Sequence, residues 1–544
     1  MENIAMKFKN IDLKRFALAI LIPFFVFFIF NKAKQLFSNQ VSFPAEETIT
    51  INLSEIPQIP WDTSKAVSHV IETFTASVNG CLISRDDAIT TDELKQNSLI
   101  ERYYCEDNIC QAFLKKNVYF HNKREVTAYD VEFSILRALL QRKKNYVVTS
   151  LLNDIVGIEE LKNTNNLPFT EVNSINYPTG LVKGIEVVDN YNIIFKLKWR
   201  NKFFLNKISI GRIPIVPIEE LDKSYTNWKK YPIGFGKYKV EYVNWEKYEF
   251  ILKKFNRKEN IPKYIRFIFS SKDEGDIKIL LGDSGRGKSG TDRKIIFPNI
   301  YSNGGFLFNF RTELGKNKKF REAISLALDR EKIADTSLYK EIIPEDQMIP
   351  AFSVLKEYRI QKPLQKQNIE RAKQLLNSIP HSLWKNKVFH VHTYWANIKN
   401  INSLPYIQEI KKQLADVGIQ VKFYDTDLNY PKFSDNDSNV LWWTGFGFSS
   451  NDPNKNFSFF KTTAYYANEG PKDSSFDSLY ELSIKNINDT SYYAKKMSEY
   501  FYNNNIFVVV LNQKMSFAYN SERLSSLGEQ HNGVLFYVWK LKLR

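Results

Sequence analysis

The sequence has few cysteines and histidines, and it lacks the short motifs that carry common catalytic chemistry. Three cysteines and six histidines occur in 544 residues. There is no G-x-S-x-G, no H-E-x-x-H and no cysteine placed near a histidine as a nucleophile pair. The acidic pairs at 159–160 and 219–220 fall on expected loops or helix ends, where solvated charges are common. We therefore expect a protein that is not an enzyme and that needs no cofactor.

Long basic runs are also absent. Lys and Arg outnumber Asp and Glu by 76 to 60, which gives a formal net charge of +16, but the Lys residues are scattered. No run of five or more basic residues stands beside a nucleic-acid motif, so we expect no nucleic-acid partner. With 43% hydrophobic and 25% charged residues, the composition is that of a globular protein long enough for two or three lobes.

One nucleotide-binding motif is complete, but its surroundings do not fit. Gly282, four further residues and Gly287-Lys288-Ser289 match G-x-x-x-x-G-K-[ST]. A working phosphate loop needs a helix directly after the lysine, with its N-terminus facing the phosphates. The continuation GTDRKIIFPN instead predicts a loop followed by a strand, and a downstream Mg²⁺-holding Asp is hard to place. We interpret the match as a basic turn.

Long hydrophobic runs are missing except at the N-terminus. Residues 16–30 (FALAILIPFFVFFIF) follow four basic residues and precede Lys32 and Lys34. A cleaved secretory signal and an uncleaved anchor both fit this pattern. No small-x-small cleavage site is evident, and the uncharged run reaches roughly 24 Å as a helix, short of a hydrocarbon core of about 30 Å. Flanking basic side chains can snorkel to the interface. We favour an anchor, with the rest of the chain periplasmic or otherwise extracytoplasmic.

The cysteines fit an exported location. Cys105 and Cys110 bracket EDNI in a stretch that predicts two strand ends and a tight turn. An oxidising compartment would permit a disulfide between them, with Cys81 outside the pair. Two alternatives remain, namely metal binding, which lacks a third ligand nearby, and two ordinary thiols.

From residue 46 onward, strand-like runs alternate with helical stretches, which predicts an α/β protein. A helix is expected over 129–141 with Thr127 as N-cap, and another over 318–335. Strand pairs are expected around turns at 189–190 and near Asn244. A third helix ends at Gly418 and leads into a strand.

Six segments, in one order, resemble the family 5 extracellular solute-binding proteins, the peptide-binding components of ABC importers. They are NVYFHNKREVTAYDVEFSILRAL (117–139), YPIGFGKYKVEYV, DEGDIKILL, the pair GGFLFNF and KKFREAISLALDREKIAD, RAKQLL, and EIKKQLADVGIQVKF. The resemblance covers roughly residues 46–540. In the FHN segment, we interpret His121 as structural.

The resemblance implies a two-lobed periplasmic-binding-protein fold of type II with an extra subdomain, preceded by one N-terminal hydrophobic helix. The domain boundaries that we expect are a signal or anchor over 1–40, lobe I over 41–80, 180–300 and 505–544, a subdomain inserted in lobe I over 81–179, and lobe II over 301–504. It further implies that a monomer captures a peptide-like or other small ligand in a cleft and delivers it to ABC permease subunits in the membrane.

The ligand-binding stretch is expected at LWWTGFGFSSNDP. Peptide-binding relatives carry an Asp after a Trp-containing strand, which pairs with the peptide amine, but here Phe446 takes that position. The resemblance and the aromatic content together give these candidate ligand contacts: Trp442, Trp443, Thr444, Gly445, Phe446 and Asp452. Phe448 belongs to the same aromatic stretch. Because neighbours alternate along a strand, at least one of the two tryptophans is expected in the core.

His390 and His392 lie two apart on an expected strand, so they share a face and raise the question of metal binding. No third ligand is nearby in the sequence, and we expect no metal site. A second function also remains open. A membrane-tethered sensor of the same fold, with no transport role, would keep the anchor and would not need the amine-binding Asp.

The interpretation of the phosphate-loop match gives a testable prediction. Lys288→Ala should leave ligand binding and folding unchanged, because the lysine serves no nucleotide. Thermal denaturation, ligand binding and nucleotide hydrolysis of the variant and the wild type provide the measurement. Loss of a hydrolytic activity in the variant would contradict our interpretation.

Overall fold

The fold is described here from a computed structural model. The residues that it describes are 43–53, 74, 76–83, 98–140, 152–158, 168–201, 203–208, 213–256, 260–270, 274–280, 293–296, 301–337, 342–351, 353, 355–393, 401–425, 440–447, 453–454, 456–462, 470–486, 490–514, 516–528 and 537–544. The predicted anchor (16–30) and the phosphate-loop match (282–289) lie outside them. Contacts divide the chain at Thr48, and the following paragraphs concern residues 49–544.

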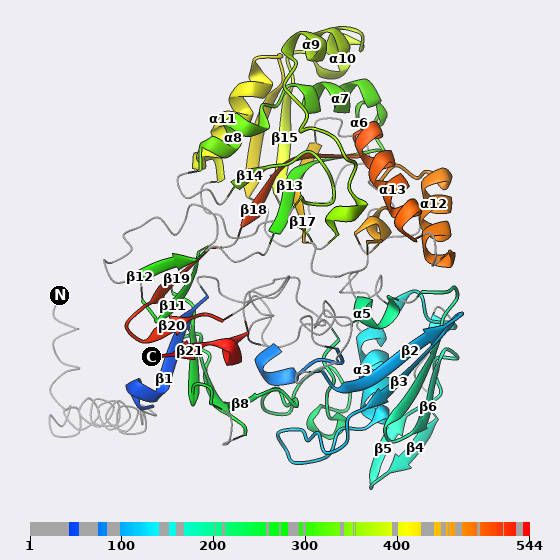
Figure 1. The fold of residues 1–544 in the computed structure, drawn as a ribbon, viewed down its shortest axis with the longest axis vertical. Helices are drawn as coiled ribbons and strands as arrows, with labels where there is room; N and C mark the ends of the chain where they lie inside the picture. Colours follow the sequence, from blue (N-terminus) through cyan, green and yellow to red (C-terminus); the bar gives the residue numbers. More distant parts are fainter. Residues whose placement is uncertain are drawn as a thin grey trace, which may run out of the picture. The chain divides into compact units, whose positions relative to one another are not determined.

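A seven-stranded mixed sheet contains both β1, near the start of the described residues, and β19, near their end (Figure 1). Its order is β12-β19-β11-β1-β10-β9-β8. The strands are β1 (Thr48–Asn52), β8 (Tyr238–Asn244), β9 (Glu249–Lys254), β10 (Tyr264–Ile268), β11 (Ile277–Leu280), β12 (Arg293–Ile296) and β19 (Ser516–Asn520). The β8–β9 hairpin confirms the turn predicted near Asn244. The buried aliphatic and aromatic side chains of these strands form one core cluster.

Asp276 connects segments at the centre of this sheet through hydrogen bonds. Its carboxylate accepts hydrogen bonds from the backbone N–H of Thr50 and from the Arg523 guanidinium, both at 2.8 Å. Its own backbone N–H donates to Thr50 O at 2.7 Å, and its carbonyl accepts from Asn520 N at 2.8 Å. The segment DEGDIKILL therefore ties three distant parts of the chain together, which is a structural role for this turn.

A second sheet of four antiparallel strands packs on α3 (Ala128–Leu140). Its order is β2-β3-β7-β6, with β2 (Ile100–Glu106), β3 (Ile109–Leu114), β6 (Ile185–Asp189) and β7 (Asn192–Lys196). A separate hairpin pairs β4 (Phe169–Val172) with β5 (Ile175–Pro178). Cys105 and Cys110 stand directly opposite each other on β2 and β3 and form a disulfide.

The start of α3 shows why its sequence forms a helix. Thr127 precedes the helix, and its carbonyl accepts from the N–H groups of Asp130 and Val131. Asp130, three residues on, reaches back to accept from the Thr127 N–H at 2.9 Å and from the Thr127 hydroxyl at 3.1 Å. The Asp130 carboxylate also holds the Arg124 guanidinium through two bonds of 2.6 and 2.9 Å. The predicted helix start is confirmed.

The third sheet has six strands in the order β14-β18-β13-β17-β15-β16. They are β13 (Tyr301–Phe308), β14 (Ile342–Pro344), β15 (Val388–Thr393), β16 (Gln420–Asp425), β17 (Val440–Gly447) and β18 (Phe507–Lys514). β15, β16 and β17 run parallel, whereas β13 is antiparallel to β17 and to β18. The carboxyl ends of the three parallel strands, the start of β13 and the end of β18 therefore share one edge.

Helices cover both faces of this sheet (Figure 1). On one face, Phe320 of α7 (Lys318–Leu326) contacts Phe308 and Phe389, and α11 (Pro405–Ala415) brings Tyr406 to Trp443. The other face is packed by α13 (Thr490–Asn504) and α12 (Ser474–Lys485) through a phenylalanine cluster. α11 ends before Gly418, which has φ +86° and leads into β16, as predicted.

The helix predicted over 318–335 is wrong in one respect, because it is two helices. α7 ends at Leu326, and α8 (Arg330–Asp335) begins after Asp329, whose carboxylate caps the Lys332 N–H at 3.0 Å. An N-cap residue takes an extended backbone conformation, which interrupts the helix although the apolar spacing continues.

The remaining elements belong to none of these sheets. They are η1 (Ala45–Glu47), α5 (Phe204–Ile208), η4 (Ile218–Glu220), α6 (Glu313–Lys316), η6 (Lys356–Tyr358), α9 (Ile369–Asn377), α10 (His381–Trp384), η7 (Ile401–Ser403), η8 (Phe457–Phe460), β20 (Leu524–Ser526), η11 (Val538–Lys540) and β21 (Lys542–Leu543). No helix among the described residues is long and apolar enough to cross a membrane. The expected lobe boundaries remain predictions; β18 and β19 follow each other closely but belong to different sheets.

The structural role of His121 is confirmed by its contacts. Its backbone N–H donates to Gly234 O at 2.8 Å, and its ring Nε2 lies 2.9 Å from Gly236 O. Both glycines cross residues 77–79 so closely that a Cβ on Gly234 would lie 2.3 Å from Asn79 Cα. The segments FHN (120–122) and PIGFG (232–236) are therefore joined by hydrogen bonds, and the second packs closely on residues 77–79. Burial lowers the pKa of His121 to about 4.

The lowered pKa predicts acid sensitivity. Because the unfolded chain binds this proton near pH 6.5 and the folded chain near pH 4, the stabilisation is complete above about pH 6.5 and is lost as the pH falls toward 4. The free energy of unfolding should fall by on the order of 3 kcal/mol over this pH range. Thermal midpoints measured between pH 7 and pH 4 for the wild type and His121→Gln provide the test. Equal acid sensitivity of the two proteins would contradict this prediction.

Candidate functional site

The candidate site is the edge of the six-stranded sheet where the parallel strands end. Ligands of open α/β sheets bind outside the carboxyl ends of the strands. β17 lies between β13 and β15 and carries most of the residues predicted from the sequence. β13 pairs with β17 so that Asn303 lies opposite Phe446 and Phe306 lies opposite Trp443.

Trp443 belongs to the core of the sheet. It is 3% exposed and packs on Phe306, Phe423 and Tyr406, with ring centroids 5.2, 6.0 and 6.5 Å away. The prediction that at least one of the two tryptophans faces the core is therefore confirmed.

Phe446 is buried on the opposite face of the same strand. Its ring contacts Phe507, Phe460 and Phe459 at centroid distances of 5.2, 5.5 and 6.2 Å, and it is 5% exposed. Its backbone N–H donates to Asn303 Oδ1 at 2.9 Å. The position where the sequence comparison expected an amine-binding carboxylate therefore holds an apolar ring among other apolar rings. A charge placed there would lose its hydration without gaining a partner.

The other predicted contacts are placed only in part. Gly445 is half-buried opposite Gly304. The side chains of Trp442 and Thr444, and the residues Phe448 and Asp452, lie outside the description. Their roles as ligand contacts remain predictions.

Sequence reasoning missed a row of polar residues beside Phe446. Asn303 and Asn512 face each other across β13 and β18, and both are buried. Asn303 Nδ2 donates to Met348 O at 2.5 Å, so both ends of its amide are used. Asn512 Nδ2 donates to Glu345 Oε2 at 3.1 Å. The one available signal was an Asn at the end of the apolar run FVVVL.

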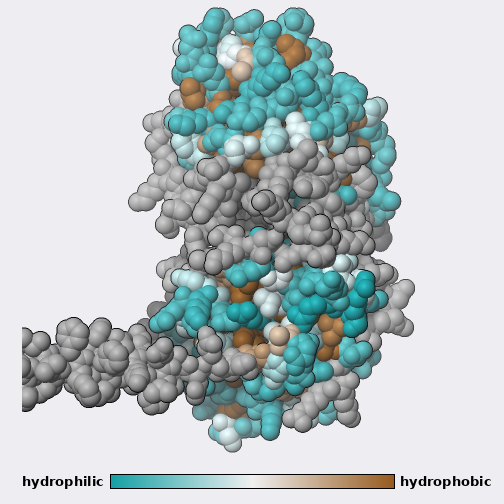
Figure 2. All heavy atoms as spheres, turned by 90° about the vertical axis from the view of Figure 1, so that its left-hand side faces the viewer, coloured by the Kyte–Doolittle hydropathy of each residue, from teal (hydrophilic) through white to brown (hydrophobic). Residues whose placement is uncertain are grey.

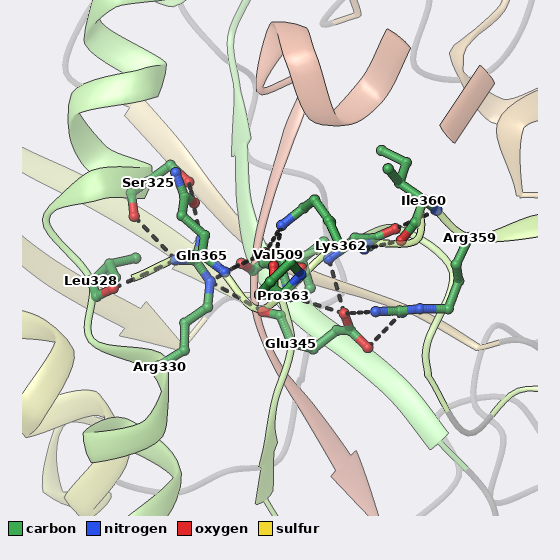
Figure 3. Close-up of polar contacts among 12 residues, drawn as sticks. Ser325, Leu328, Arg330, Glu345, Arg359, Ile360, Lys362, Pro363, Gln365 and Val509 are labelled. Atoms are coloured by element: carbon green, nitrogen blue, oxygen red, sulfur yellow. Dashed lines mark hydrogen bonds and ion pairs between the residues drawn. The ribbon is translucent and has the colours of Figure 1, made fainter. Parts of the chain in front are cut away.

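Glu345 is the anchor of this row (Figure 3). It follows β14 and is 1% exposed on its side chain. The Arg359 guanidinium approaches its carboxylate with two bonds of 2.8 and 2.9 Å. The backbone N–H groups of Asp346, Gln347 and Ala351 donate to the same carboxylate at 2.9 to 3.1 Å. The charge is buried but fully partnered, which is the condition under which such a pair is tolerated.

Arg330 holds the other side of the same turn (Figure 3). Its buried guanidinium donates to Glu345 O, Val509 O and Ser325 O at 3.2, 2.9 and 3.2 Å. Burial lowers the pKa of Arg330. Next to the turn, Lys362 pairs with Asp346 at 2.6 Å. The turn after β14 is thus fixed to β18 and to the start of α8, and Asn512 is fixed with it.

His390 and His392 share one face of β15, as predicted. Both rings contact Tyr424 on β16, at centroid distances of 5.2 and 5.7 Å, and Lys422 Nζ lies 5.0 Å from the same ring. Within the described ranges, no group of three or more His, Cys, Asp and Glu side chains could hold a metal ion.

The Glu345–Arg359 pair gives a stability prediction. Arg359→Met should cost about 3–5 kcal/mol, because it leaves a buried carboxylate without its counter-charge. The double variant with Glu345→Gln should lose less than the sum of the single variants. The exposed pair Lys366–Glu331, at 2.7 Å, is the control, and Lys366→Met should cost less than about 1 kcal/mol. Urea unfolding of the wild type and the four variants is the measurement; additive losses for Arg359→Met and Glu345→Gln would contradict a coupled pair.

The chain matches one protein-family model. The model of bacterial extracellular solute-binding proteins, family 5, matches residues 106–468. Among proteins with curated descriptions, none matches.

Solved structures share the fold. The ABC transporter substrate-binding protein CtaP from Listeria monocytogenes has a TM-score of 0.69 at 18% identity, covering 91% of this chain and 99% of its own. The oligopeptide-binding protein AppA from Bacillus subtilis, in complex with a nonapeptide, has 0.69 at 17% identity with the same coverage. NikZ from Campylobacter jejuni, in complex with Ni(L-His), has 0.67 at 15% identity, covering 92% of this chain and all of its own. The chain is a member of the family 5 bacterial extracellular solute-binding proteins.

Proposed function

We propose that this protein captures a peptide-like or other small ligand outside the cytoplasm and delivers it to an ABC permease. The family match over residues 106–468 carries this proposal. The N-terminal run 16–30 would keep the protein at the extracytoplasmic face of the membrane.

The ligand need not carry a free amine. Phe446 sits among three phenylalanine rings, and the buried carboxylate of Glu345 is already paired with Arg359. Among the described residues, none is shown to offer a free carboxylate to a buried ammonium at this position. We therefore favour ligands that present neutral groups to Phe446.

The protein would act as a monomer. In the view of Figure 2, hydrophobic residues of the described surface form small separate patches among hydrophilic ones. Large continuous apolar patches are the usual mark of a permanent protein interface, and this face shows none among the described residues.

Native mass spectrometry of the full chain in detergent tests the proposal. We expect a pool of random pentapeptides to bind, and N-terminal acetylation to change the affinity less than about threefold. Binding at least tenfold tighter for the free amines would show that another group pairs with the ammonium. Deleting the permease should abolish uptake of a bound ligand; a ligand-dependent response without any uptake would instead indicate a tethered sensor.

A further inference from the structure

A contact between Trp199 and Lys461 joins two separate hydrophobic cores. Trp199 follows β7 of the four-stranded sheet, yet its ring packs against the core cluster of the six-stranded sheet. The Lys461 ammonium lies 5.2 Å from the centroid of the Trp199 ring and 5.0 Å from that of Tyr480 on α12. An ammonium within about 6 Å of an aromatic face is attracted by the ring. Lys461 is thus shared between rings from two different parts of the fold.

The segment that carries Trp199 is fixed in the core of the four-stranded sheet. On either side of Trp199, Leu197 and Phe204 are fully buried in that cluster. Asn108, in the turn between β2 and β3, accepts from the Leu197 N–H through its carbonyl at 2.7 Å. Its side-chain Nδ2 donates to Leu197 O at 3.0 Å. Trp199 therefore extends from a fixed backbone toward the other core.

The position of Lys461 is fixed by α12. The next residue, Thr462, donates its backbone N–H to Asp477 at 3.0 Å, and its hydroxyl donates to the same carboxylate. Tyr480 lies about one turn further along this helix and is buried. Burial lowers the pKa of Lys461, and nearby carboxylates such as Asp477 oppose this effect. The ammonium has lost part of its hydration, which is the condition under which ring contacts are strongest.

The indole N–H of Trp199 opposes the same contact. Its Nε1 is buried and finds no acceptor among the described residues. A buried donor without a partner costs free energy, and this cost disappears when the group meets water. The ring contacts with Lys461 stabilise the joined form, whereas the unpaired N–H favours separation. Such opposing contributions suit a contact that forms and breaks.

Proteins with the periplasmic-binding-protein fold open and close by hinge motion. We propose that Trp199, Lys461 and Tyr480 form a clasp that stabilises the closed form of this protein. Because a ligand leaves from the open form, the clasp would slow ligand release without touching the ligand. The effect on release rests on the proposed function, whereas the effect on opening does not.

Pulsed electron paramagnetic resonance of the full chain in detergent measures opening with and without a ligand. Spin labels at Val188→Cys on β6 and Lys373→Cys on α9, both exposed, report the distance between the two sheets in a Cys81→Ser background. Trp199→Ala and Lys461→Met should each lower the ratio of short to long distances about fivefold. Lys461→Arg keeps the cation and should restore the wild-type distribution. Trp199→Leu replaces the alanine variant if alanine prevents folding.

Ligand release is measured on the same variants with a pool of random pentapeptides. Native mass spectrometry after dilution should show dissociation about fivefold faster for Trp199→Ala and for Lys461→Met. The double variant should be little faster than either single one, because both remove the same contact. Lys422→Met is the matched control, since its ammonium lies 5.0 Å from the Tyr424 ring within one sheet. This control should change neither opening nor release.

Two results would overturn the clasp. One is an unchanged distance distribution and an unchanged release rate in the Trp199 variants, and the other is a Lys461→Arg protein that behaves like Lys461→Met. If the distances shift as expected but release does not, the clasp does not control the ligand. If the distances shift and no protein binds the pool, wild type included, the clasp stands and the peptide-like ligand of the proposed function is wrong.

Discussion

The buried carboxylate of Glu345 is the constraint on which the open edge of the six-stranded sheet depends. A charge in this place must be surrounded by donors, and the chain supplies Arg359, three backbone N–H groups and Asn512. Each donor comes from a segment that is thereby fixed. The low polarity that makes the unpaired charge costly also makes the completed network rigid.

The two faces of β17 show how one strand serves packing in two different layers. Trp443 faces the layer of α7 and α11, whereas Phe446 faces the phenylalanine cluster of η8 and α13. Both side chains are buried, so the aromatic content of LWWTGFG reflects two cores at least as much as a binding surface. The buried Asn303 and Asn512 face each other across β13 and β18, and Asn512 joins them to the Glu345 turn.

Local patterns in the sequence identified most of the fold. The helix start after Thr127 and the stop at Gly418 are readable because each depends on residues a few positions apart. The break at Asp329 was missed because the apolar spacing of the helix continues across it. The Glu345 site was also missed, since Glu345 and Asn512 meet across 167 positions and neither residue is unusual locally. Family resemblance places the candidate site on β17, where the ligand contacts remain predictions, and it could not show which polar groups would be buried and paired.

The contacts of Asp276 bear on how such a chain reaches its final location. Its carboxylate joins Thr50, 226 positions earlier, to Arg523, 247 positions later. Closing such long loops is slow, because the entropy of the chain must be lost before the contacts compensate for it. The central strand β1 lacks part of its surroundings until almost the last residues are available. In a chain exported from its N-terminus, β1 would therefore complete these contacts only after the C-terminal segment has followed.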